Sequence, residues 1–332
     1  MAVRSFERDS LSQRPFALQW LWQAGYGART VVLRGQGSAQ KEDEDKVIRR
    51  IDMIVEEITP AIGARITATT EQVLADGGPE RILELLNARG VLVFPQLFLS
   101  DEGLAALANR LGDMEAATVT ADGSDVNRLG IYRIERGKTD TNHADYVAGN
   151  DYWHMDGTSY DVPGKATLLK CESPPKSGGE TDFAHLFAAF AALPASRQNE
   201  LKQLEVIHCM RGAMRYVYDA PTEADYARWD AVFPETPHPL VWRMRDGRHT
   251  LLIGSTAYRL AHHEDDAGRA VLEELLAWCT QPQFTYQHVW QQGDLVIFNN
   301  PGLLHRSRPY DEHSGRILHR ATVKGAEPIV AA

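Results

Sequence analysis

Residues Gly293 to Gly325, GDLVIFNNPGLLHRSRPYDEHSGRILHRATVKG, contain the pattern that decides the fold. Residues 295–298 form a short apolar run behind a Gly-Asp turn, and residues 316–323 alternate with period two. Both patterns predict strands, which together would form a hairpin-like unit. His305 is expected in the connection between them, where a rigid sheet can present a side chain from a loop.

Alternation places four side chains on one face of the second predicted strand: Arg316, Leu318, Arg320 and Thr322. At the rise of a strand, the two arginines would lie about 13–14 Å apart. That spacing suits opposite ends of one cavity better than joint binding of one small anion. The stretch therefore predicts a cavity with a histidine and two separate cations, provided that the rest of the chain supplies partners for His305.

The composition is that of a globular protein, with 332 residues, 43% hydrophobic residues and a formal net charge of -10. This length can bury a large core in one big domain or two ordinary ones. The excess of acidic over basic residues argues against a nucleic-acid or anionic-membrane partner, because both require a basic surface. We therefore expect local positive charge to mark a binding site.

The three cysteines, Cys171, Cys209 and Cys279, are widely spaced and form no CxxC motif. Their odd number predicts no disulfide framework and no structural zinc site built from thiolates, as in a reducing cytoplasm. No apolar run approaches the roughly 18–20 residues of a membrane span, and no secretory apolar region follows the first basic residues. These features indicate a cytoplasmic protein.

Two regions are expected along the chain. Residues 1–52 include the charged run 41–46 and show no clean period, so we expect an N-terminal arm, either loosely packed or disordered, or a non-native extension ahead of Met53. Residues 53–332 are regular and are expected to form the catalytic domain. Within it, the polar, turn-rich residues 114–149 are a candidate flexible lid.

Short strands recur through this domain, separated by helices. Strands are expected at 90–95, 129–134, 166–169, 204–209, 241–244, 250–253 and 284–289, with helices at 70–88 (two), 101–111, 183–193, 194–204 and 271–278. Regular strand–helix–strand alternation is missing, which argues against a doubly wound fold. The pattern favours a mainly β fold with helical insertions, in which two sheets face each other as a jelly roll.

The partners that His305 needs occur in NDYWHMD, residues 150–156. His154 and Asp156 are two positions apart, so at a strand end both side chains point to the same face. Two imidazoles and one carboxylate form a facial triad, which leaves three positions open on Fe(II). A chelating cosubstrate can occupy two of these positions and dioxygen the third.

Two alternatives compete with this reading. A second His-x-Asp pair, His143 and Asp145, lies in the polar candidate lid without aromatic or strand context. The same two histidines and carboxylate could also hold Zn(II) with a water molecule for hydrolysis. Binding of a chelating cosubstrate would separate an oxygenase from a zinc hydrolase.

Five features agree in order and spacing with a known family: His154-Met-Asp156, Gly178-Gly-Glu-Thr181, Gly293-Asp294 before a strand, His305, and Arg316 eleven residues later. Over about residues 53–325 the sequence resembles the Fe(II)/2-oxoglutarate-dependent TauD/TfdA dioxygenases. The resemblance implies a double-stranded β-helix, or jelly roll, with His154, Asp156 and His305 as iron ligands. It also implies that the enzyme consumes O2 and 2-oxoglutarate and releases succinate and CO2.

The resemblance assigns further roles. Arg316 and Thr181 would bind the distal carboxylate of 2-oxoglutarate, whose two oxygens match the planar fork of a guanidinium. Arg320 and Asn150 would contact the prime substrate, although Arg320 could instead pair with a neighbouring carboxylate. Residues 112–119 lack the histidine and tyrosine with which taurine enzymes hold their substrate, which disfavours taurine.

The substrate expected from the resemblance is a small anionic organic molecule, such as an aryloxyalkanoate, a sulfonate, a sulfate ester or an amino-acid derivative. The presence of Asp156 favours hydroxylation, because a halogenase needs that ligand position for halide. No nucleic-acid or membrane partner is expected, and a homo-oligomer is compatible with the sequence.

Overall fold

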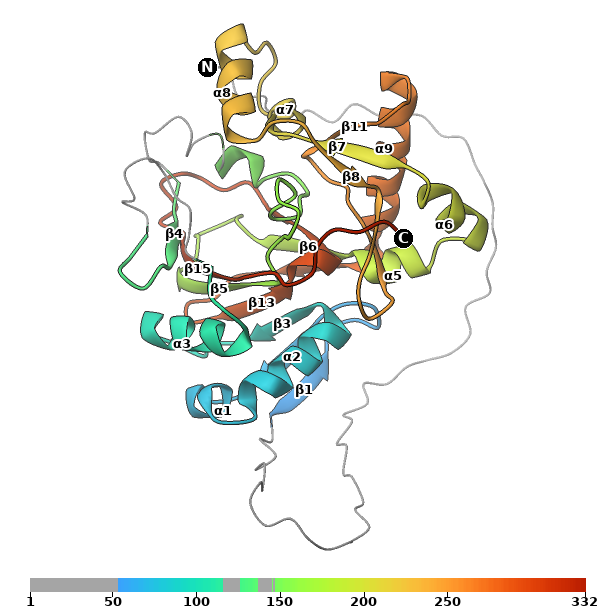
Figure 1. Ribbon diagram of the computed structural model, residues 1–332. Helices are drawn as coiled ribbons and strands as arrows, with labels where there is room; N and C mark the ends of the chain where they lie inside the picture. Colours follow the sequence, from blue (N-terminus) through green and yellow to red (C-terminus); the bar gives the residue numbers. More distant parts are fainter. Residues whose placement is uncertain (1–52, 116–125, 137–144, 146) are drawn as a thin grey trace, which may run out of the picture. The chain divides into compact units, whose positions relative to one another are not determined.

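The computed structural model of the protein describes residues 53–115, 126–136, 145 and 147–332 (Figure 1). The predicted arm over residues 1–52 lies outside the described residues, as do three parts of the candidate lid, 116–125, 137–144 and 146. Within the described residues, no helix is long and apolar enough to cross a membrane.

A seven-stranded sheet forms the centre of the fold. Its neighbouring strands pair antiparallel except for the parallel pair β2 and β3. The spatial order is β1 (Ile54–Glu57), β2 (Ala64–Thr67), β3 (Val91–Phe94), β13 (Leu295–Asn299), β5 (Ala166–Ser173), β15 (Ile317–Val323) and β4 (Tyr132–Ile134).

A smaller sheet faces the large one and contains β12 (Thr285–His288), β6 (Thr181–His185) and β14 (Leu303–Ser307), in that order. The two sheets share a buried core, in which Phe183 and Leu303 of the small sheet meet Val93, Val296 and Phe298 of the large one. Two further groups of strands are β11 (Ala257–Leu260), β7 (Glu205–His208) and β8 (Thr236–Pro239), and β10 (His249–Leu251) with β9 (Val241–Arg243).

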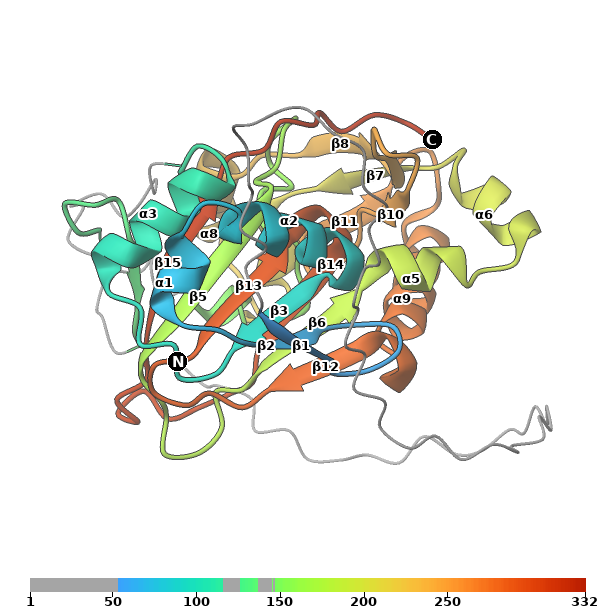
Figure 2. The ribbon, with the colours of Figure 1, turned by 90° about the horizontal axis from the view of Figure 1, so that it is seen from below.

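Helices cover the outer face of the large sheet: α1 (Thr70–Leu74), α2 (Gly78–Arg89) and α3 (Asp101–Leu111) (Figure 2). Strand β3 is therefore buried on both faces, which explains its continuous apolar sequence VLVF. Helix α3 begins where the sequence predicts, because the Ser100 side chain accepts a hydrogen bond from the Gly103 N–H at 3.1 Å.

The remaining helices lie in the long connection between β6 and β12, apart from one turn before β14. They are α5 (Leu186–Ala191), α6 (Ala195–Leu201), α7 (Met210–Met214), α8 (Glu223–Val232), α9 (Asp265–Cys279) and the 3-10 turns η1 (Pro282–Phe284) and η2 (Asn300–Gly302). Apolar residues of α5 and α9 form one core with Ala184 and Leu304, which point away from the large sheet. The small sheet is thus covered on this outer face as well.

The predicted hairpin over residues 293–325 is wrong, although both of its strands form. β5 lies between β13 and β15 in the large sheet. The physical reason is η2, whose Asn-Pro-Gly turn takes the chain out of the large sheet and into the small one. His305 consequently lies in a third strand, β14, and not in a loop.

The helix predicted over residues 183–193 is wrong in its first turn. Phe183 to His185 belong to β6, and the helix α5 begins only at Leu186. β6 is the central strand of the small sheet and pairs with both β12 and β14. The local sequence pattern is equally compatible with a helix, so the pairing on both sides decides that these residues form a strand.

Gly254, after β10, supports the segment that carries the first candidate ligands. Its φ of +115° favours glycine, and a Cβ added there would lie 2.8 Å from the Trp153 carbonyl oxygen and 3.2 Å from the His154 Cα. The adjacent Ser255 N–H donates to the Trp153 carbonyl at 2.7 Å. A side chain at position 254 would therefore displace the backbone of residues 153 and 154.

We expect Gly254→Ala to lower the free energy of unfolding by at least about 2 kcal/mol, because backbone strain and a steric clash add. The matched control is Gly247→Ala, which has φ +88° but no atom within 4 Å of the added Cβ. The control should lose only the free energy of unfolding that corresponds to backbone strain, about 1 kcal/mol. Urea unfolding of both variants measures the difference, and equal losses would show that the contact with residues 153 and 154 is unimportant.

Candidate metal centre

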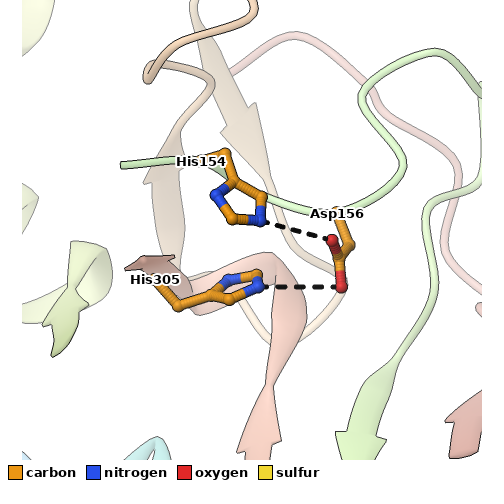
Figure 3. Close-up of side chains that lie close together, drawn as sticks. All are labelled: His154, Asp156 and His305. Carbon is orange, nitrogen blue, oxygen red and sulfur yellow. Dashed lines mark ion pairs between the residues drawn. The ribbon is translucent and has the colours of Figure 1, made fainter. Parts of the chain in front are cut away.

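Two segments that are distant in sequence pair at the centre. The backbones of His154 and His305 exchange hydrogen bonds, from His154 N–H to His305 O at 3.0 Å and from His305 N–H to His154 O at 2.9 Å. This bridge joins the segment before Asp156 to β14. As a result, the side chains of all three predicted ligands point toward one another (Figure 3).

The spacing of the candidate ligand atoms suits a metal ion. His154 Nε2 lies 3.7 Å from Asp156 Oδ1, and His305 Nε2 lies 3.8 Å from Asp156 Oδ2. Ligand bonds of about 2.0–2.2 Å place neighbouring donor atoms roughly 3–4 Å apart. The donor set, two imidazoles and one carboxylate, is that of an iron-binding facial triad.

Hydrogen bonding and burial prepare the two histidines for metal binding. His154 Nδ1 lies 2.8 Å from the Tyr152 carbonyl oxygen. This carbonyl can only accept, so Nδ1 carries a proton, and Nε2, which faces the centre, is the nitrogen of this ring that could bind a metal. Burial lowers the pKa of His305 to about 3, with the nearby His154 contributing in the same direction.

Asp156 is held in its charged form. Burial alone would raise its pKa, but the neighbouring His305, Arg320 and His154 outweigh that effect and hold the pKa below its usual value. The hydroxyl of the buried Thr167 faces the carboxylate and acts in the same direction. The site thus offers one negative charge to a cation.

The backbone of Asp156 is held by Asn300, a residue that sequence reasoning missed. The Asn300 side chain accepts a hydrogen bond from the Asp156 N–H at 3.1 Å and donates one to the Asp156 carbonyl at 2.9 Å. In the sequence, Asn299-Asn-Pro-Gly302 signals only a turn. Nothing in that pattern indicates that the second asparagine contacts a residue 144 positions earlier.

Arg316 is buried and only 4% exposed. Its Nε donates to the Gly179 carbonyl at 3.1 Å, and its guanidinium lies 4.7 Å from the ring of Tyr310. Desolvation by burial lowers its pKa. Among the described residues no carboxylate lies within ion-pair distance of Arg316, so this buried cation suits an anion supplied from outside the chain.

Gly178 and Gly179 explain how Arg316 reaches this position. Both have a φ near +70°, and a Cβ on Gly179 would lie 3.0 Å from the Arg316 Cδ. Thr181 follows in β6, 3% exposed, and its hydroxyl accepts a hydrogen bond from the Trp290 indole N–H at 3.0 Å. That hydroxyl keeps its own proton to donate. Tyr310 and Trp290 were not predicted, since neither belongs to a recognisable pattern.

Arg320 lies beside the metal centre, with Nη1 3.9 Å from Asp156 Oδ2 and its guanidinium 5.2 Å from the Tyr132 ring. Asp156 is thus a carboxylate near Arg320 among the described residues. Asn150 is half-buried, and its carbonyl accepts a hydrogen bond from the Ser307 N–H at 2.8 Å. This bond extends the contact between β14 and the segment that precedes the ligands.

The competing His-x-Asp pair is only partly described, because His143 lies outside the described residues. The carboxylate of Asp145 is buried and accepts hydrogen bonds from Trp229 at 3.1 Å, Arg228 at 2.9 Å and Tyr218. With these three donors it serves to join the start of the 145–150 segment to α8.

A second group of possible ligands contains Asp101, Glu172 and His319. Lys170 already contacts both carboxylates, and its amine lies 2.6 Å from Asp101 Oδ1. His319 also binds Asp101, at 2.8 Å. The lysine supplies the positive charge that a metal would bring, so this group is a structural ion-pair network.

A surface hollow lies on the opposite face of β14, lined by Trp153, Arg306, Arg308, Asp182 and Gln287, among others. Arg306 and Arg308 both contact Asp182 through Nε, at 2.9 and 2.7 Å. Because neighbouring residues of a strand point to opposite faces, Arg306 points away from the centre that His305 faces. The hollow is therefore separate from the candidate metal centre.

The sequence matches known proteins over most of its length. The model of the family described as "Taurine catabolism dioxygenase TauD, TfdA family" matches residues 54–322. The 2,4-dichlorophenoxyacetate dioxygenase of Cupriavidus pinatubonensis, named as alpha-ketoglutarate-dependent, is 32% identical over 73% of this chain and 86% of that protein. The (S)-phenoxypropionate/alpha-ketoglutarate-dioxygenase of Sphingobium herbicidovorans is 29% identical over 79% of this chain and 92% of that protein.

A solved structure is similar as well. AAD-2, crystallised with Mn(II) and N-oxalylglycine, superposes with a TM-score of 0.69 and is 26% identical over 84% of this chain and all of its own. N-oxalylglycine is an analogue of 2-oxoglutarate, which is the same compound as alpha-ketoglutarate. The chain belongs to the TauD/TfdA family of 2-oxoglutarate-dependent dioxygenases, oxidoreductases that use Fe(II), 2-oxoglutarate and O2.

Proposed function

We propose that His154, Asp156 and His305 bind the Fe(II) of this dioxygenase. The observation that carries the proposal is the meeting of their three ligand atoms within 4.8 Å of one another, in protonation states that suit a divalent cation. The two facing sheets that hold these residues correspond in our proposal to a double-stranded β-helix, with the metal between the sheets. A zinc hydrolase has no use for 2-oxoglutarate, so that alternative has no support.

Arg316 and Thr181 would hold the distal carboxylate of 2-oxoglutarate. The guanidinium is buried, and it donates through Nε to the Gly179 carbonyl and through Nη1 to the Tyr310 hydroxyl at 3.4 Å, which leaves the other N–H groups of its terminal nitrogens for a carboxylate. The proton of the Thr181 hydroxyl provides a further donor. When bound, the iron and 2-oxoglutarate supply the oxidising chemistry, in which O2 is consumed and succinate and CO2 are released.

The proposed substrate is a small anionic molecule, with an aryloxyalkanoate as the first candidate and a sulfate ester as the second. The similar proteins from Cupriavidus and Sphingobium are named for 2,4-dichlorophenoxyacetate and phenoxypropionate, both aryloxyalkanoates, and a partial relative is an alkylsulfatase. Arg320 beside the metal ligands would bind the acidic group, with Asn150 nearby. Hydroxylation at a carbon that bears an ether oxygen gives a product that collapses into two fragments.

The decisive experiment is an anaerobic titration with Fe(II) and then 2-oxoglutarate, followed by visible absorption. A charge-transfer band from the chelate is expected only if both bind at one centre. Substrates are then compared in air by succinate release, using aryloxyacetates, 2-aryloxypropionates, alkyl sulfates and taurine. Absence of the band, or of succinate release with every acid, would contradict the proposal.

Replacing His154, Asp156 or His305 by Ala is expected to abolish substrate-dependent succinate formation and to weaken Fe(II) binding, because each change removes one of three protein ligands. The matched control is His319→Gln in the other cluster of possible ligands, which should bind Fe(II) like the wild type. Equilibrium dialysis under argon measures the affinity. Wild-type binding by any of the three Ala variants would mean that the ligands have been misassigned.

Arg316→Ala is expected to weaken 2-oxoglutarate binding roughly ten- to hundred-fold, because a charged, bidentate hydrogen-bonding partner contributes about 1.5–3 kcal/mol. Fe(II) affinity without 2-oxoglutarate should change little. Arg308→Ala removes an arginine that lines the surface hollow and serves as the control. The dependence of the chelate band on 2-oxoglutarate concentration gives the 2-oxoglutarate affinity, and equilibrium dialysis gives the Fe(II) affinity. An unchanged midpoint for 2-oxoglutarate in Arg316→Ala would refute the role of Arg316.

Arg320→Leu is expected to raise the KM for the preferred acidic substrate at least roughly tenfold, because one charged partner is lost, while 2-oxoglutarate affinity stays nearly unchanged. The control is the neutral primary amide of the same substrate, on which wild type and variant should act equally. Equal losses on the acid and the amide would show that Arg320 acts through Asp156 and not on the substrate.

A further inference from the structure

The side chain of Asn300 connects the two chain segments that carry the candidate ligands. Asn300 is 1% exposed and lies at the start of η2, five positions before His305. Its carboxamide makes three hydrogen bonds, two to the backbone of Asp156 and one to the Gly164 carbonyl at 3.1 Å. Its own N–H donates to the Lys165 carbonyl at 3.2 Å.

These partners fix how the carboxamide is oriented. Its nitrogen faces two carbonyl oxygens, of Asp156 and Gly164, which can only accept, and its oxygen faces the Asp156 N–H, which can only donate. The reverse orientation would set oxygen against oxygen and nitrogen against nitrogen. Asn300 therefore binds the peptide groups on both sides of the Asp156 Cα in one defined geometry.

This contact restrains the backbone of a residue that lies outside the strands. Residues 156–164 form turns and bends ahead of β5, so Asp156 does not belong to a regular strand. Among the described residues, His154 pairs in β fashion only through the isolated bridge to His305. Asn300 supplies the corresponding restraint two residues further on.

We propose that Asn300 is a positioning residue for the metal centre, which sets the place of Asp156 relative to His305 and thereby the affinity and ligand geometry of the bound ion. The inference rests on the proposed assignment of His154, Asp156 and His305 as the ligands. Asn300 would act without binding the metal, because its carboxamide oxygen and nitrogen both face backbone groups. Its effect is that of an outer-shell partner, whose loss typically weakens metal binding about 10–100-fold.

Two substitutions separate geometry from simple loss of contact. Asn300→Asp keeps the size of the side chain and one accepting oxygen but sets its second oxygen against two carbonyls. Asn300→Ala removes all three hydrogen bonds and leaves space in which the Asp156 peptide groups can be rehydrated. Both should weaken metal binding, and the aspartate variant should do so without opening a cavity.

Asn299→Ala is the matched control. Asn299 is the preceding residue, is 8% exposed, and accepts a hydrogen bond from the Gly302 N–H at 3.2 Å within η2. Its side chain has no contact with a candidate ligand in the hydrogen bonds of the described residues. It therefore tests whether loosening η2 alone disturbs the centre.

The experiment is a titration of the full chain with Co(II) under argon without 2-oxoglutarate, following the visible bands of the bound ion. Thermal unfolding of each variant is measured alongside, and titrations are run at a fixed interval below each Tm. We expect at least tenfold weaker Co(II) binding and altered bands for Asn300→Asp and Asn300→Ala. Asn299→Ala should have the wild-type affinity and bands.

Wild-type affinity and bands in Asn300→Asp would overturn the inference, as would an equal loss in Asn299→Ala. Failure of the proposed function would look different. In that case the wild-type chain would show no Co(II) bands that depend on His154 and His305, whatever residue occupies position 300.

Discussion

The structure depends on one pair of backbone hydrogen bonds, through which His154 and His305 face each other. Only in an antiparallel pair do two residues exchange both bonds, and such a pair brings the two side chains to the same face. This contact brings the two imidazoles together, 4.1 Å between ring centroids. The large sheet, the small sheet and Gly254 hold the two segments in register. The carboxylate of Asp156 then completes the set because it lies two residues beyond His154.

Much of the fold and of the candidate site could be predicted from the sequence. The parts that could not be predicted depend on contacts between residues distant in sequence, which local patterns do not reveal. His154, Asp156 and His305 were identified because few residue types bind iron, and the structure brings all three together. The strands at 295–298 and 316–323 form, since continuous or alternating apolar residues follow from burial. Their pairing could not be predicted, because β5 enters between them from more than 100 residues upstream. His305 was assigned to a loop because it follows the turn signal Asn299-Asn-Pro-Gly302, and Phe183 to His185 were assigned to a helix. The supporting residues Asn300, Tyr310 and Trp290 act through contacts distant in sequence, which leave no periodic signal.

Charge is distributed unevenly between the surface and the interior. The chain is acidic overall, yet Arg316 is almost fully buried, and no carboxylate of the described residues pairs with it. Burying a cation in this way costs several kcal/mol unless a counter-ion is present. A dianionic cosubstrate would supply that counter-ion. The free-energy cost of burying Arg316 would then be offset when the cosubstrate binds and not when the chain folds. Arg320 differs, because the carboxylate of Asp156 already lies beside it. The positive charge of Arg320 helps to keep Asp156 ionised. The same charge would draw electron density away from the carboxylate and so weaken its donation to a bound metal.

The separation of the ligands along the chain also affects how the protein folds. His154 and His305 are 151 positions apart. β6 pairs with β14 although the long connection of residues 186–284, with its helices and strands, lies between them in the sequence. Contacts between residues so distant in sequence form slowly, because a long loop must close before they gain any stabilisation. A nascent or partly folded chain can therefore present no more than the close pair His154 and Asp156 to a metal ion. If His154, Asp156 and His305 bind the metal as proposed, the three ligands come together only when the last strands have joined the sheets, so high-affinity metal binding would follow the assembly of the fold.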